Sequence, residues 1–157
     1  MRGKLYAEKV MIVDADQITP MHFHWSKTED IINRGGGKLV IQLYNATPDE
    51  GLATADVVVT LDGLYRTLRA GDTVVLQPGD SITLPDHLYH QFWGTESRVL
   101  AGEVSSVNND KADNRFLNPV GRFPAIQEDE PPLHLLITDY ERYYQSNQGL
   151  DKAHSMA

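Results

Sequence analysis

The chain has 157 residues, with 22 acidic residues against 14 basic ones, a net charge of −8 and no cysteine. This length suits one domain, and the absence of any basic patch argues against nucleic acids and anionic membranes as partners. Without cysteine there is no disulfide framework and no thiolate chemistry. The first five residues lack the apolar core of a signal peptide, and no run approaches ~18 apolar residues, so we expect a cytoplasmic protein.

Short apolar runs alternate with Gly, Pro, Asn and Asp turn signals along most of the chain, a pattern typical of β-structure. The runs have lengths typical of strands and are too short for stable isolated helices. The expected strands are residues 8–13, 19–24, 29–33, 38–44, 56–61, 65–68, 73–76, 81–84, 90–93, 98–104 and 133–138. These elements predict an all-β β-sandwich or barrel of the jelly-roll kind.

The turn signals set the expected organisation. Asp62-Gly63 predicts a two-residue β-hairpin, and the glycine run at residues 34–37 is expected to turn the chain and to permit close backbone approach. Residues 105–132 are polar and predict a long ordered loop with one short helical turn, of the kind that often carries function. We expect one domain over residues 1–157, with a barrel core at about 5–139 and a frayed tail at 140–157.

Three histidines and a glutamate have the spacing of a metal site. His22 and His24 are two residues apart, so on a strand both imidazoles point to one face. Glu29 follows closely enough for a tight turn to return its carboxylate beside them, and His90 joins the set if the sheet folds over on itself. Imidazole nitrogens with one carboxylate oxygen suit Mn, Fe, Co, Ni or Zn and do not suit Ca or Mg.

The same residues carry a resemblance to the cupins. The pattern His-X-His, four residues, Glu, six residues, Gly resembles the first cupin motif, and Gly, five residues, Pro, then His resembles the second. They are met by His22, His24, Glu29 and Gly36, and by Gly79, Pro85 and His90. Two positions depart from the second motif: His87 stands where glycine is usual and Gly94 where asparagine is usual. Neither position is a metal ligand in cupins.

A closer resemblance is to the D-lyxose isomerases. It is carried by residues 20–37, 84–93, 102–108 and 113–117, which together cover most of 19–117. The resemblance implies a cupin jelly-roll barrel that binds a small sugar and interconverts D-lyxose and D-xylulose, with D-mannose and D-fructose as a second pair. It also implies a divalent metal. We predict Mn²⁺, with Co²⁺, Fe²⁺, Ni²⁺ and Zn²⁺ as alternatives, because mixed nitrogen and oxygen donors accept several metals.

Lys27 and Glu103 are the expected catalytic and substrate-binding residues. Lys27 lies between two metal ligands, and a nearby dication is expected to lower its pKa, as a proton-transferring lysine requires. Glu103 ends an apolar strand, where a carboxylate is costly unless it faces a cavity or a partner. Each residue has a simpler alternative, Lys27 as a solvated turn residue and Glu103 as an exposed strand end. The resemblance favours the functional one.

Asp113 and Arg115 are further candidates for binding sugar hydroxyls. A salt bridge that stabilises the loop is an equally good interpretation of this polar stretch. Trp25, Phe92 and Trp93 flank the ligands, where their rings could stack on a sugar or simply fill the barrel.

The function predicted from the sequence is a metal-dependent aldose–ketose isomerase that works by proton transfer through an enediol. A hydride shift is the rival route. The alternatives are an Fe(II) cupin dioxygenase, which the polar Lys27, Glu103 and Asp113 disfavour, and a non-catalytic sugar-binding cupin, which the intact ligand set disfavours. We expect a homodimer, because small jelly rolls expose sheet edges that a symmetric partner commonly covers.

Overall fold

The computed structural model describes residues 5–110, 112–119, 130 and 133. By its internal contacts the chain divides into two units, Met1–Val120 and Gly121–Ala157, and the first unit holds every strand of the described residues. The expectation of one domain over residues 1–157 stays a prediction.

All regular secondary structure in the described residues is strand, which confirms the all-β class. The strands are β1 (Tyr6–Val13), β2 (Ile18–Phe23), β3 (Glu29–Asn45), β4 (Val57–Leu61), β5 (Leu64–Leu68), β6 (Thr73–Leu76), β7 (Ser81–Leu84), β8 (Leu88–Ser106) and β9 (Arg115–Phe116). Within this described part, the structure has no helix of the length and apolarity that crossing a bilayer requires.

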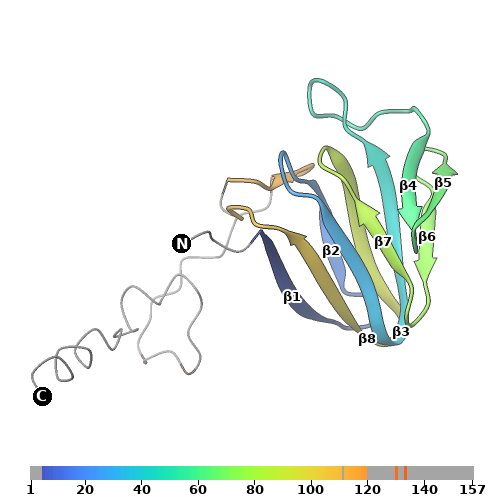
Figure 1. The fold of residues 1–157 in the computed structure, drawn as a ribbon, viewed down its shortest axis with the longest axis vertical. Helices are drawn as coiled ribbons and strands as arrows, with labels where there is room; N and C mark the ends of the chain where they lie inside the picture. The colour runs from blue at the N-terminus through green and yellow to red at the C-terminus, as the bar shows by residue number, and fades with distance from the viewer. Residues whose placement is uncertain (1–4, 111, 120–129, 131–132, 134–157) are drawn as a thin grey trace, which may run out of the picture. The chain divides into compact units, whose positions relative to one another are not determined.

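Two long antiparallel strands, β3 and β8, form the centre of the sheet (Figure 1). β6 and β7 pair with the other edge of β3, whereas β1 and β2 pair with the other edge of β8. β4 and β5 extend the sheet beyond β7, and β9 extends it beyond β2. Among the described residues this path of strand pairs is open, so hydrogen bonds do not close the expected barrel.

The core forms where alternate side chains of these strands face inward. Along β3 every second residue is buried over most of its length, as expected for a strand with one covered face. The buried apolar cluster includes Ile31, Leu39, Ile41, Ile82 and Phe92. Toward both ends of the β3–β8 pairing some buried positions are polar, namely Glu29, His90 and Glu103, and the candidate site lies where they meet.

The glycine run turns the chain as expected, but it does so within one continuous strand. β3 continues through it with bulges between Asn33 and Gly35 and between Gly36 and Lys38, and β8 is likewise one strand where two were expected. β3 folds back here, because Glu29 Oε1 at its start lies 3.1 Å from Nε2 of His90, which pairs with Leu43 near its end. The close approach is confirmed: a Cβ on Gly36 would lie 2.0 Å from the carbonyl oxygen of Arg98. Gly36 also has a φ of +92°, which a residue with a side chain rarely adopts.

The predicted hairpin at Asp62-Gly63 is confirmed, with positive φ angles of 48° and 79° between β4 and β5. His87, at the cupin glycine position, has a φ of 55° in the turn between β7 and β8.

The expected short helical turn is present near residue 109, because the amides of Ala112 and Asp113 both donate to the carbonyl of Asn109. β9 was not expected. The expected strand at 133–138 and the tail at 140–157 lie outside the described residues, apart from Leu133.

Candidate metal centre and its charged neighbours

Three imidazoles converge at one end of the sheet. His22 lies on β2 directly opposite His90 on β8, and His24 follows the end of β2. One ring nitrogen from each of these three buried residues can be chosen so that all lie within 4.8 Å of one another. The ring centroids of His22 and His90 are 4.2 Å apart. The sequence prediction that His22, His24 and His90 come together is therefore confirmed as a geometric fact.

Each imidazole is oriented through its Nδ1 atom. His22 Nδ1 lies 2.7 Å from the carbonyl oxygen of Pro20, His24 Nδ1 lies 2.8 Å from that of Asp113, and His90 Nδ1 lies 3.0 Å from that of Leu88. A carbonyl oxygen can only accept, so the proton of each neutral ring belongs on Nδ1. The Nε2 atoms are then left with a free lone pair, as metal-binding histidines require.

Glu29, the first residue of β3, lies against two of the three imidazoles. Its Oε1 atom lies 3.3 Å from His24 Nε2 and 3.1 Å from His90 Nε2. All three of these atoms are buried and have no hydrogen-bond partner among the described residues. Three acceptors facing one another without a donor are costly, and a cation between them removes that cost. The residues present therefore fit a metal held by His22, His24, Glu29 and His90.

The ionisation of these groups agrees with a cation site. Burial, with the neighbouring His90, lowers the pKa of His22 well below its usual value, so its ring is neutral at pH 7. Burial alone would raise the pKa of Glu29, but contacts with His24 and His90 and the charge of Lys27 outweigh burial and lower it. Three neutral rings and one carboxylate leave a bound dication with net positive charge.

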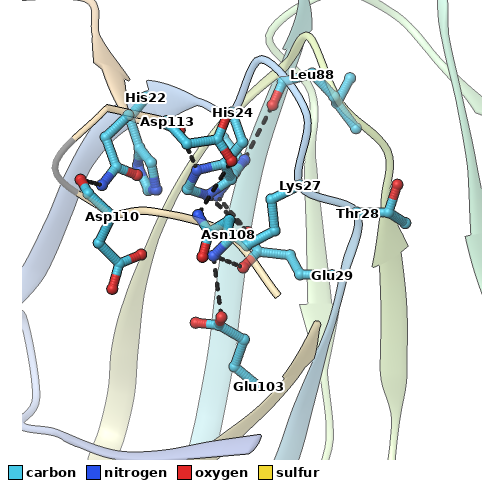
Figure 2. Close-up of polar contacts among 12 residues, drawn as sticks. His22, His24, Lys27, Thr28, Glu29, Leu88, Glu103, Asn108, Asp110 and Asp113 are labelled. Atoms are coloured by element: carbon cyan, nitrogen blue, oxygen red, sulfur yellow. Dashed lines mark hydrogen bonds and ion pairs between the residues drawn. The ribbon is translucent and has the colours of Figure 1, made fainter. Parts of the chain in front are cut away.

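Lys27 and Glu103 lie beside this set and are joined to it by ion pairs (Figure 2). Lys27 Nζ is 2.7 Å from Glu29 Oε2 and 3.0 Å from Glu103 Oε1. The side chains of Lys27 and Glu103 are only 3% and 7% exposed, so neither is the solvated residue of the simpler alternative. Burial opposes the charge of Lys27, yet the two carboxylates raise its pKa. The expected lowering by a bound dication concerns the metal-loaded protein and stays a prediction.

The ion pairs continue to the surface through a residue that the sequence did not suggest. Lys9 on β1 stands opposite Glu103 in the strand register, and its Nζ atom lies 3.1 Å from Glu103 Oε1. The same Nζ lies 3.4 Å from Asp110 Oδ1. Burial alternates along β1 in the structure, but its sequence does not alternate between polar and apolar residues, so only the pairing of β1 with β8 identifies Lys9 as the neighbour of Glu103.

Asp113 supports the metal centre through hydrogen bonds. Its backbone carbonyl accepts from His24, while its carboxylate accepts from the backbone amide and hydroxyl of Ser26 and from the amide of Asn108. Burial would raise the pKa of Asp113, but these hydrogen bonds lower it. With both carboxylate oxygens engaged, Asp113 connects the loop after β8 to the segment between His24 and Lys27. Its expected contact with sugar stays a prediction.

Arg115 makes a salt bridge with a loop residue that was not among the candidates. Its Nε atom lies 2.7 Å from Glu50 Oε2, and Glu50 Oε1 accepts from the indole of Trp25 at 3.0 Å. The hydroxyl of Tyr89 donates to the carbonyl of Glu50. Glu50 thus joins Trp25 to β9. This agrees with the alternative that Arg115 forms a salt bridge that stabilises the loop. The role of Arg115 in substrate binding stays a prediction.

The flanking aromatic residues have different environments. Phe92 is part of the buried core, whereas Trp25 is partly exposed. Phe116, which was not a candidate, lies on β9 with its ring centroid 5.4 Å from that of His22. His87 is separate from the metal set and stacks on Phe23 at 5.3 Å. This placement agrees with the expectation that His87 is not a ligand.

Sequence comparison identifies close relatives. A family model described as D-lyxose isomerase matches residues 1–140. A D-lyxose/D-mannose isomerase of Serratia proteamaculans is 55% identical over 143 residues, which are 90% of this chain and 63% of that protein. A protein of the same name from Escherichia coli O157:H7 is 51% identical over 142 residues, covering 89% of this chain and 63% of that protein. The chain thus spans less than two thirds of the length of these relatives.

Structure comparison supports the fold. An L-ribose isomerase of Acinetobacter sp. DL28, solved as a mutant with L-ribose, matches with a TM-score of 0.51 and 18% identity. The match covers 72% of this chain and 59% of that one. At this identity the likeness concerns the fold alone, and it confirms the expected jelly roll.

Proposed function

The chain belongs to the D-lyxose isomerase family, and from this membership we propose that it is a metal-dependent aldose–ketose isomerase that converts D-lyxose to D-xylulose. D-mannose and D-fructose form the second pair of sugars, in keeping with the names of the two relatives. The observation that carries the proposal is the convergence of His22, His24 and His90, with Glu29 against two of them and in contact with the buried ion pairs of Lys27 and Glu103.

A metal ion fits the residues present and would be held by His22, His24, Glu29 and His90. When bound, it supplies positive charge that polarises the sugar carbonyl and stabilises negative charge on oxygen. We propose Mn²⁺ as this ion, with Co²⁺, Fe²⁺, Ni²⁺ and Zn²⁺ as alternatives, because the donor set does not select among them.

Glu103 is the proposed base. Conversion of the aldose requires that a proton leave C2 and arrive at C1, while a hydroxyl proton moves from O2 to O1. The Glu103 carboxylate takes the proton from C2, which gives an enediol, and returns it to C1. Its burial removes competing water, and its place beside Lys27 brings it close to the metal ligands.

Lys27 is the proposed donor to the sugar oxygens. Its raised pKa keeps it as an ammonium with three N–H groups. Two of them are directed to Glu29 and Glu103, and the third can donate to substrate oxygen. The same buried charges disfavour the apolar pocket that a dioxygenase acting on an aromatic substrate needs. Binding of the sugar by Asp113 and Arg115, a cytoplasmic location and a homodimer remain further parts of the proposal.

The test is an assay of D-xylulose formation from D-lyxose after thorough chelation and after readdition of single metals. We expect EDTA to abolish the activity and Mn²⁺ or Co²⁺ to restore it. The variant His24→Ala should stay inactive at any metal concentration tested, whereas His87→Ala, which alters a histidine outside the set, should retain activity. Full activity of the chelated protein, or turnover only with consumption of O₂, would refute the proposal.

A further inference from the structure

We propose that Lys9 is a positioning residue for the isomerase, which holds one oxygen of Glu103 and leaves the other free to act on the substrate. This inference rests on the proposed function, in which Glu103 is the base. Neither the family resemblance nor the metal geometry assigns any role to Lys9.

The contacts on Glu103 are unequal. Lys27 and Lys9 approach the same atom, Oε1, at 3.0 Å and 3.1 Å. No described residue makes a hydrogen bond or ion pair with Oε2. A free carboxylate rotates easily about its last torsion and exchanges its two oxygens. Two ammonium groups on one oxygen oppose that rotation, so the structure distinguishes a held oxygen from an available one.

Lys9 is suited to this role by its place in the sheet. It is the direct cross-strand neighbour of Glu103 in the pairing of β1 with β8, where side chains of opposite charge lie within reach of each other. Its ammonium is held from the other side by Asp110, on the loop that also carries Asp113. The resulting series runs Glu29, Lys27, Glu103, Lys9, Asp110 with alternating charge.

Lys27 cannot hold Glu103 independently of the metal centre, because it also contacts Glu29. In contrast, the ion pairs of Lys9 are with Glu103 and Asp110, neither of which is in the metal set. Lys9 therefore holds Glu103 through a contact that involves none of the metal ligands. Lys9 is 38% exposed, so water screens its ion pair and the contribution to stability is small, but precise placement of a base affects turnover strongly.

Lys38 offers a matched control. Its side chain is 37% exposed against 38% for Lys9, and it also forms an ion pair from a strand position, with Glu96. Lys38 pairs with Thr95 near the middle of the β3–β8 ladder, away from the pair of Ile31 and Glu103. Removal of either lysine deletes one half-exposed cation from the sheet, but only Lys9 touches Glu103.

The experiment compares Lys9→Met, Lys9→Arg and Lys38→Met with the wild type, each with its full metal complement, for kcat and KM on D-lyxose, metal content and thermal unfolding. We expect Lys9→Met to lower kcat on the order of tenfold, with KM, metal content and Tm close to those of Lys38→Met. Lys9→Arg keeps the cation and should recover most of the turnover. A kcat for Lys9→Met equal to that of Lys38→Met would overturn the inference.

A double-mutant cycle separates this inference from the proposed function. If Lys9 acts through Glu103, Lys9→Met should have no further effect in a Glu103→Gln background. An equal additional loss in that background would overturn the positioning role while leaving Glu103 as the base. Full turnover of Glu103→Gln would instead refute the base assignment, and with it the action of Lys9 through Glu103. A large fall in Tm or metal content for both Lys9 variants would show a structural role and also overturn the inference.

Discussion

The imidazole of His24 donates to the backbone carbonyl of Asp113 across 2.8 Å, although the two residues lie 89 positions apart in the chain. His22 and His90, by contrast, are oriented by carbonyls two residues before them on their own strands. One of the three imidazoles is therefore positioned only when the loop after β8 is in place. Formation of the metal centre and closure of that loop are coupled.

The first prediction concerns metal content. Purified protein should hold about one divalent ion per chain, and His24→Ala should reduce this to a small fraction because it removes one of the converging Nε2 donors. Elemental analysis after dialysis measures this, with His87→Ala as the control histidine. Equal metal content in wild type and His24→Ala would disprove the site.

The second prediction concerns Asp113. Asp113→Ala should weaken metal binding about 10-fold to 100-fold, because the carboxylate fixes the loop whose carbonyl orients His24. Titration of the chelated protein with Mn²⁺ measures the affinity. Asp86→Ala removes an exposed carboxylate outside these contacts and should bind as the wild type does. An unchanged affinity in Asp113→Ala would mean that His24 is oriented without this loop.

The third prediction concerns proton transfer. Glu103→Gln preserves the shape of the side chain but removes its basicity, so turnover should fall on the order of 10²–10⁴-fold. In D₂O the wild type should incorporate solvent deuterium at C1 or C2, which nuclear magnetic resonance of the recovered sugars detects. Near-complete retention of the original hydrogen would favour a hydride shift and reduce Glu103 to orienting the sugar.

The fourth prediction concerns pH. The pKa of His22 is lowered in the fold, so the unfolded chain takes up a proton first as the pH falls below about 6.5, the ordinary histidine value. Protonation then favours unfolding, and the stabilisation present at higher pH is lost. For metal-free protein we expect a loss of about 1 kcal/mol from this group between pH 7 and pH 5.5. Urea unfolding measures it, and His22→Gln should show a correspondingly smaller loss.

The fifth prediction concerns the glycine run. Gly36→Ala places a methyl group 2.0 Å from the Arg98 carbonyl and at a positive φ, so it should lower the free energy of unfolding by about 3 kcal/mol. Gly35→Ala meets nothing within 4 Å and should cost less, since only its backbone conformation is strained. Similar unfolding midpoints for the two variants would show that β3 shifts away from β8 at little cost.

Local sequence patterns determined much of this protein. Alternating apolar residues predicted most strand positions, because burial of one face imposes a two-residue period. Asp62-Gly63 specified its hairpin through the positive φ angles that such a turn requires. The convergence of His22, His24 and His90 could be predicted because His22 and His24 are two residues apart at the end of one strand and because the fold class joins that strand to His90.

The tertiary structure decided what depends on contacts between distant segments. The glycine run became a bulged part of β3 because β8 pairs with it on both sides of the bulges. The pKa of Lys27 rises because two carboxylates from different strands reach it, and Lys9 meets Glu103 only through the pairing of β1 with β8. Strand register and charge interactions act through space, and one sequence position contains no information on its cross-strand neighbour. The convergence of the three histidines could therefore be predicted from the sequence, but the ion pairs around them could not.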